Sequence, residues 1–203
     1  MAGIRVCYAT DVKITNSIFK ENPGLNCIIL GYTTNGYVGN CSFINVAESV
    51  KGNKYIFDHS AIISAGKDFK AENNRLLNDD YIATNELGKG RVSTAIECNA
   101  YGQIITNNYI ENFNIGVLPS PVGTTSLENA VISNNVIKNC NYALSVWCAE
   151  EKTANTTSLI FSNNVIESSL NYSFAIDLIR YTSVQTSNIQ IVNNVIFSKI
   201  KDR

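Results

Sequence analysis

The stretch that decides the fold is Val131-Ile-Ser-Asn-Asn-Val-Ile137, because copies of it recur along the chain. Close copies are Ile105-Thr-Asn-Asn-Tyr-Ile110, Phe161-Ser-Asn-Asn-Val-Ile166 and Ile191-Val-Asn-Asn-Val-Ile196, and looser ones are Ile14-Thr-Asn-Ser-Ile-Phe19, Val38-Gly-Asn-Cys-Ser-Phe43 and Ala71-Glu-Asn-Asn-Arg-Leu76. The first Asn of each copy gives a series of seven: Asn16, Asn40, Asn73, Asn107, Asn134, Asn163 and Asn193. They recur with a period of about 30 residues, which is typical of solenoid proteins.

Each copy predicts two short strands joined by a tight corner at the Asn pair. The residue two before the first Asn and the residue three after it are apolar in every copy, as expected of inward positions on strands. Asn suits the corner because its short amide tolerates the left-handed backbone conformation and hydrogen-bonds locally. Stacked repeats would bring these amides together, so the sequence predicts an Asn ladder along one corner of the coil.

A third segment completes each repeat. A small residue followed by an apolar one precedes every Asn pair, as in Ala95-Ile-Glu-Cys98 and Ala143-Leu-Ser-Val146, and we expect it to form the first strand of each coil. Three short strands per repeat predict an all-β fold, a right-handed single-stranded parallel β-helix of about seven coils, with residues 1–203 as one domain. Neither end carries an amphipathic helix or a polar cap, so we expect uncapped ends and a middle fragment of a longer chain.

This repeat of a small residue, Ile, any residue and an apolar residue, followed by Ile-x-Asn-Asn-x-Ile, resembles the repeat of right-handed β-helix proteins of the pectate-lyase-like superfamily, which includes phage tailspikes. The resemblance covers nearly the whole chain. It implies a polysaccharide ligand, depolymerase activity as a glycoside hydrolase or lyase in many members, no catalysis in others, and a location on the virion surface or outside the cell. Many tailspikes are homotrimers, so the resemblance also implies that assembly. The Arg-x-Pro-x-x-Arg stretch of pectate lyases, a set of calcium-binding aspartates and the polygalacturonase motifs are missing, which disfavours those activities.

Composition argues against several partners and cofactors. Lys and Arg total 16 and Asp and Glu total 17, which gives no electrostatic reason to expect nucleic acid or an anionic membrane as a partner. The sequence has no apolar run of about 18 residues, so no membrane insertion is expected. Six cysteines without CxxC or Cys/His spacing predict no metal site and no cofactor, and coil register places Cys98 in the core as a reduced thiol.

Unequal spacing between the repeats indicates a binding face. The connections that enter the first strands of coils three and four, from Phe43 to Ile62 and from Leu76 to Ile96, are much longer than those that enter the other coils. The connections that leave the first strands of coils five to seven are longer than the corresponding ones in coils one to four. Both sets border the same sheet, and insertions on repeat scaffolds collect around the binding face. We therefore expect a polysaccharide groove along the outer face of the first-strand sheet.

Glu97 is the expected centre of a catalytic cluster. Strand alternation places it outward on the first-strand sheet, beside the long connections that carry Asp58, His59, Asp80 and Arg91. Asp58 or Asp80 would supply a second carboxylate for hydrolysis or for proton abstraction beside a uronate, and His59 is the only candidate histidine base. Arg91 would bind an acidic sugar or keep a carboxylate ionised. The alternative is that Asp80 belongs to a simple turn and Glu97 is a solvated strand residue.

Further outward positions are candidates for substrate binding. Trp147, the only tryptophan, would stack on a sugar ring, with Glu150 in the loop that follows and Tyr181 one coil on; alternatively it packs under its own loop. Asp177 is three coils from Glu97, hence about 14 Å, beyond the ~5–9.5 Å of catalytic carboxylate pairs. Two functions stay open: a carbohydrate-active segment that binds and cleaves a cell-surface polysaccharide with acidic residues, and a non-catalytic receptor-binding or structural β-helix shaft.

Overall fold

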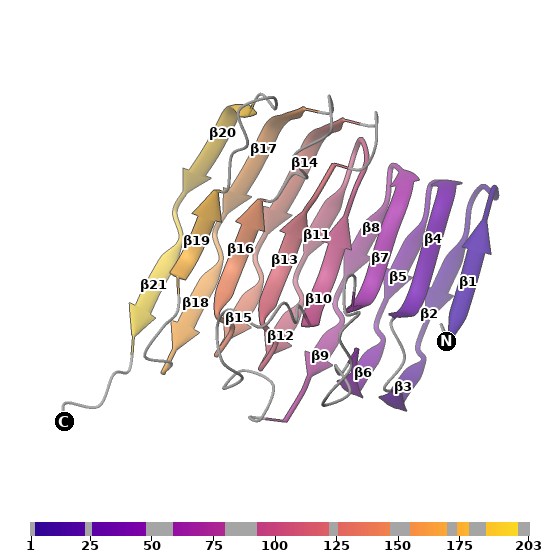
Figure 1. Ribbon diagram of the computed structural model, residues 1–203, viewed down its shortest axis with the longest axis horizontal. Helices are drawn as coiled ribbons and strands as arrows, with labels where there is room; N and C mark the ends of the chain where they lie inside the picture. The colour runs from indigo at the N-terminus through magenta and orange to yellow at the C-terminus, as the bar shows by residue number, and fades with distance from the viewer. Residues whose placement is uncertain are drawn as a thin grey trace, which may run out of the picture.

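The computed structural model describes residues 3–22, 26–47, 59–79, 93–121, 126–146, 155–169, 174–178 and 186–198. In these ranges the regular structure is 21 β-strands, which pair in parallel into three sheets of seven (Figure 1). Within each sheet, neighbouring strands are three apart along the chain, because every coil contributes one strand to each sheet. The expected all-β fold, a parallel β-helix with three short strands per coil, is confirmed.

The three sheets are named A, B and C in the order in which the chain visits them. Sheet A contains β1 (Ile4–Cys7), β4 (Asn26–Thr34), β7 (His59–Lys67), β10 (Ser93–Cys98), β13 (Ile115–Pro119), β16 (Tyr142–Val146) and β19 (Phe174–Leu178). Sheet B contains β2 (Lys13–Thr15), β5 (Tyr37–Gly39), β8 (Lys70–Glu72), β11 (Ile104–Thr106), β14 (Leu127–Ser133), β17 (Thr156–Ser162) and β20 (Thr186–Val192). Sheet C contains β3 (Ile18–Asn22), β6 (Ser42–Val46), β9 (Arg75–Leu77), β12 (Tyr109–Glu111), β15 (Val136–Lys138), β18 (Val165–Ser168) and β21 (Val195–Ser198).

The core is a stack of apolar layers, one for each coil. The layer of coil four, for example, is made by Ile96 of sheet A, Ile105 of sheet B and Ile110 of sheet C, and all three are fully buried. Each lies in register with the apolar residues of the coils before and after it. Complete burial of one such side chain contributes on the order of 1.5–3 kcal/mol, so the repeated apolar columns provide the main driving force for folding.

The corner between sheets B and C is a two-residue turn in every coil. Its first residue is always Asn, with φ between 53° and 57°. Asn accepts this left-handed conformation at lower cost than most residues, which explains why it recurs at this position. The side chains of these seven first asparagines are exposed.

The expected Asn ladder is present, and the second residue of each turn forms it. The Oδ1 atom of Asn108 accepts hydrogen bonds from both the backbone N–H and the side-chain amide of Asn74, each at 3.0 Å. The same pair of bonds joins Asn108 to Asn135, Asn135 to Asn164, and Asn164 to Asn194. Each of these amides also donates to a strand carbonyl one coil earlier, as Asn135 Nδ2 does to Ile105 O at 3.0 Å. The ladder therefore fastens successive coils through a hydrogen-bonded row of amides that is buried from Asn74 to Asn164.

Long connections occur at the two edges of sheet A. On one edge, residues 47–58 lie between the end of β6 and the start of β7, and residues 78–92 lie between the end of β9 and the start of β10. On the other edge, residues 147–155 separate the end of β16 from the start of β17. The turns between sheets B and C, by contrast, never exceed two residues. Insertions therefore border sheet A, as the spacing of the repeats predicts.

Candidate functional site

Glu97 lies in β10, in the middle of sheet A, and is 4% exposed. One carboxylate oxygen accepts a hydrogen bond from Ser60 Oγ at 2.7 Å, and the other accepts one from Asn99 Nδ2 at 3.0 Å. Ser60 belongs to the neighbouring strand β7, and Asn99 follows β10 directly. Glu97 is therefore a buried, hydrogen-bonded carboxylate, and the alternative of a solvated strand residue is wrong.

Asn99 adds an unusual feature to this centre. Its side chain is buried, and its Oδ1 atom has no hydrogen-bond partner. An unsatisfied buried acceptor costs about 1–3 kcal/mol, so proteins seldom keep one without a reason. The Glu97 centre, defined as Ser60, Glu97 and Asn99, thus holds one bonded carboxylate and one buried acceptor without a hydrogen-bond partner.

The outer face of sheet A differs along its length. Leu118 and Ser145 continue the register of Glu97 into β13 and β16, and both are buried. Toward the N-terminal end of the sheet the corresponding side chains are more exposed to solvent. Ile29 and Ile63 are half-buried, and Arg5 is exposed. The face around Glu97 is therefore closed in the structure, whereas the face over the first coils is accessible.

Asp177 lies in β19, in register with Ser145 of β16. Three strand spacings separate it from Glu97, which corresponds to about 14 Å. The two carboxylates therefore do not form a catalytic pair, as the sequence predicts. Burial first, and then the charge of Asp177, raise the pKa of the nearby Tyr142, which lies in β16.

The backbone of His59 begins β7 and pairs with Ser93 of β10. His59 therefore directly precedes Ser60, which bonds Glu97, and this is the one predicted neighbour of Glu97 that falls in the described ranges. The other predicted site residues lie outside them: Asp58, Asp80, Arg91, Trp147, Glu150 and Tyr181.

Sequence reasoning missed Ser60. It placed Asn99, two residues after Glu97, on the same outer face by strand alternation, but it did not identify Asn99 as a partner of the carboxylate. Ser60 gave no such signal, because alternation breaks beside it: Ala61 and Ile62 are consecutive and both fully buried. Counting from Ile62 predicts that Ser60 points inward, whereas its Oγ bonds the Glu97 carboxylate.

A second polar cluster covers the middle of sheet C. Tyr109 Oη donates to Glu111 Oε2 at 2.6 Å, while Arg75 Cζ and Lys138 Nζ lie 5.9 and 5.8 Å from the centroid of the Tyr109 ring. Lys138 Nζ also lies 3.4 Å from Glu167 Oε2. Burial, followed by the hydrogen bond to Glu111, raises the pKa of Tyr109 to about 12. We call these five residues the Tyr109 cluster.

The pKa of Tyr109 predicts a loss of stability in alkali. The folded-state pKa of about 12 lies above the ordinary value of 10.0, so the folded protein binds the phenolic proton more tightly than the unfolded chain. This contribution is complete below pH 10 and disappears as the pH rises toward 12. We expect the unfolding free energy of the wild type to fall more steeply over this interval than that of Tyr109→Phe. Urea unfolding at a series of pH values measures the difference, and parallel curves would contradict the assignment.

Four of the five described cysteines lie in the core: Cys27, Cys41, Cys98 and Cys140. Cys7 is half-buried, none of the five forms a disulfide, and Cys148 lies outside the described ranges. Cys98 is fully buried, which confirms its predicted place in the core. Burial raises the pKa of the Cys98 thiol, and it raises the pKa of Cys140 to about 12. Both thiols therefore stay protonated near neutral pH and are poor nucleophiles.

Other common site types are missing from the described part of the chain. It contains no group of three or more His, Cys, Asp or Glu side chains that could hold a metal ion. No helix within it is long and apolar enough to cross a membrane. The sequence matches no protein-family model, and no curated protein is significantly similar to it. Its function has to be inferred from the chemistry of its own residues.

Proposed function

We propose that this chain is a carbohydrate-active β-solenoid that binds a cell-surface polysaccharide along sheet A and cleaves it at Glu97. The observation that carries the proposal is the Glu97 centre, in which a buried carboxylate lies beside the unpaired Oδ1 of Asn99. Burial of a charged group is costly, so a carboxylate that is kept buried on this sheet is a candidate for a functional role. A sugar hydroxyl is a hydrogen-bond donor, so it would satisfy the acceptor that the protein leaves open.

The long connections support sheet A as the binding face, because they border both of its edges in the central and later coils. In this proposal Glu97 acts as the general acid or base, and Asp58 or Asp80 supplies the second carboxylate from the connections that enter β7 and β10. Such a pair serves hydrolysis with a water or carboxylate nucleophile, or proton abstraction beside a uronate carboxyl. A virion-surface or extracellular location and a trimeric assembly belong to the same proposal, through the resemblance to tailspikes.

A non-catalytic receptor-binding or structural shaft is the second candidate. The closed face around Glu97 favours it, since a carboxylate that is 4% exposed and bonded at both oxygens offers little surface to a substrate. The continuous Asn ladder favours it as well, because a row of inter-coil bonds makes a stiff rod. In this role the Glu97 centre would only fasten β7 to β10.

An assay of the wild-type chain separates the two candidates. Host-type surface polysaccharides are presented on a glycan array, and release of reducing ends from the same polysaccharides is measured in solution. We expect both binding and release. Binding without release would favour the receptor-binding role, and the absence of both binding and release would favour the structural shaft.

A further inference from the structure

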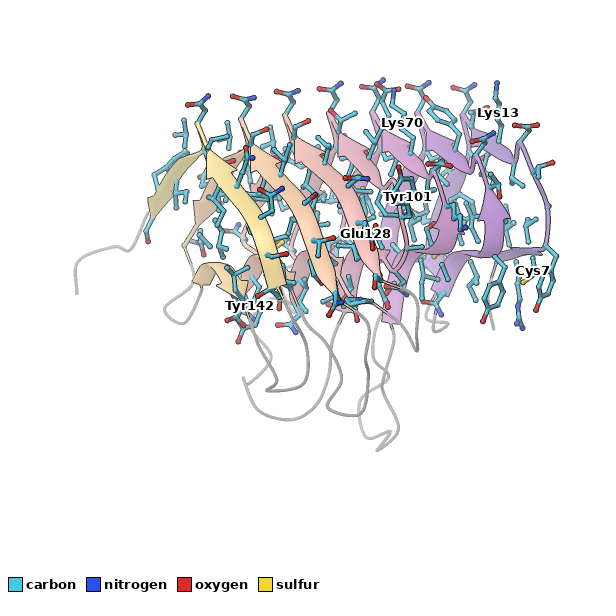
Figure 2. All side chains as sticks on the ribbon, turned by 90° about the horizontal axis from the view of Figure 1, so that it is seen from above. Cys7, Lys13, Lys70, Tyr101, Glu128 and Tyr142 are labelled. Atoms are coloured by element: carbon cyan, nitrogen blue, oxygen red, sulfur yellow. The ribbon has the colours of Figure 1, made fainter. Side chains whose placement is uncertain are left out.

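A shallow depression of ≈ 530 Å³ lies at the corner between sheets B and C, in coils three and four. Its walls are Asn73, Asn74, Arg75, Asn107 and Tyr109. In Figure 2, Lys70 of β8, the strand that ends at this corner, and Tyr142 of sheet A lie on opposite sides of the solenoid. The depression is therefore separate from the Glu97 centre and does not take part in the proposed cleavage.

Arg75 is the only charged residue among the walls of the depression. It is exposed, and its guanidinium lies over the ring of Tyr109. The nearby acids are already engaged: Glu72 with Lys70 at 2.8 Å, Glu111 with Tyr109 at 2.6 Å, and Glu167 with Lys138 at 3.4 Å. The guanidinium is thus free for an anion, and it presents two parallel N–H donors to a carboxylate.

Asn73 and Asn107 provide neutral hydrogen-bonding groups on either side of this cation. Both stand in left-handed corners with φ of 56° and 57°, and both side chains are exposed. Their backbone N–H groups bond Thr106 O and Ser133 O, so the corners themselves are fixed. One coil, about 4.8 Å, separates the two amides, and each offers a donor and an acceptor to solvent.

The floor of the depression is rigid. Asn74 belongs to the ladder, where its side chain donates to Val38 O at 2.9 Å and to Asn108 Oδ1 at 3.0 Å. Tyr109 is held by its hydrogen bond to Glu111. The aromatic ring supplies an apolar surface for the C–H groups of a sugar. A preformed site of this kind loses little conformational entropy when a ligand binds.

We propose that this depression is a binding subsite for a hexuronate residue of an acidic polysaccharide. Arg75 pairs with the uronate carboxylate, Asn73 and Asn107 bond the ring hydroxyls, and the edge of Tyr109 contacts the sugar ring. The exposed asparagines continue along the same corner, one per coil, and offer equivalent amides to neighbouring sugars of the polymer. The subsite does not depend on catalysis at Glu97, because it lies on another face of the solenoid.

Titration of the full chain with oligogalacturonate tests the proposal, with calorimetry for the affinity and ¹H–¹⁵N NMR for the location. We expect Arg75→Gln to weaken binding about tenfold, as loss of a charge-assisted pair does, and the side-chain amide signals of Asn73 and Asn107 to shift in the wild type. Lys67→Gln is the matched control, because it removes one exposed positive charge at the end of β7, at the corner between sheets A and B, and it should bind like the wild type. Methyl-esterified oligogalacturonate, which lacks the charge, should bind at least tenfold more weakly.

The results of these titrations distinguish binding at the depression from binding along sheet A. Equal binding by Glu97→Gln and weaker binding by Arg75→Gln would support the subsite even if the Glu97 proposal fails. Unchanged affinity in Arg75→Gln, equal affinity for acid and ester, or weaker binding only in Glu97→Gln would overturn it. Absence of wild-type binding at millimolar oligogalacturonate would overturn it as well.

Discussion

Replacement of Asn135 by alanine is expected to lower the free energy of unfolding by about 3–6 kcal/mol, because several buried groups lose their partners at once and each costs about 1–3 kcal/mol. Asn135 Oδ1 accepts from the N–H and the amide of Asn108 at 2.9 and 3.0 Å, and its own amide donates to Ile105 O and to Asn164 Oδ1, each at 3.0 Å. Alanine replaces none of these bonds, and the side chain of Asn135 is buried away from water. Chemical denaturation followed by circular dichroism measures the change.

The control for this variant is Asn134→Gly. Asn134 is adjacent, exposed and left-handed with φ of 57°, and its side chain takes no part in the ladder. Glycine adopts this conformation freely, so the control is expected to stay within about 1 kcal/mol of the wild type. If Asn135→Ala also stayed within that limit, the ladder would contribute little and the stacked apolar layers alone would hold the coils together.

Replacement of Phe43 by alanine is expected to cost about 3–5 kcal/mol, the usual range for removal of a buried aromatic side chain. Phe43 is fully buried in β6, and its ring stacks on that of Phe19 with a centroid distance of 4.8 Å and an interplanar angle of 5°. Alanine leaves a cavity between two coils, and hydrogen-bonded strands on both sides prevent it from collapsing.

Phe43→Leu is the matched variant, since it keeps most of the apolar volume and removes only the aromatic stacking. We expect it to cost less than about 1.5 kcal/mol, in line with other swaps that nearly conserve volume. Unfolding midpoints in urea compare the two variants directly. Equal losses would mean that the Phe19 and Phe43 stacking, and not the filled volume, stabilises this layer.

The fold could be predicted from the sequence because one signal repeats. A single Ile-x-Asn-Asn-x-Ile segment is an ambiguous strand pair, whereas seven copies at similar intervals agree on inward columns, corner and stacking direction. The corner that carries the ladder could also be predicted, since the first Asn of each pair is among the few residues that accept a left-handed conformation. Which Asn of the pair forms the ladder was not predictable, because both are small amides, and only the geometry of the turn directs Asn135 inward and Asn134 outward.

The candidate site was only partly predictable, for two physical reasons. Strand alternation predicted that Glu97 lies on the outer face of sheet A, but it did not predict that the side chain is buried. Burial depends on tertiary packing that no local pattern encodes. Alternation does not hold at Ala61 and Ile62, which are both fully buried, so the bond from Ser60 to Glu97 could not be foreseen. The depression at Arg75 needs the register between coils three and four, and only strand pairing places Arg75 directly beside Tyr109.

The central claim, that Glu97 cleaves a polysaccharide, is tested most directly by the release of reducing ends by the wild type, Glu97→Gln and Glu128→Gln. Glutamine keeps the shape of Glu97 and accepts the bond from Asn99, so the fold should be retained. Glu128 is an exposed glutamate on β14 of sheet B, so its variant controls for the loss of one negative charge (Figure 2). We predict that Glu97→Gln lowers the rate of release at least about 100-fold, as loss of a general acid or base does, and that Glu128→Gln leaves it unchanged. Release by Glu97→Gln at the wild-type rate would contradict the account.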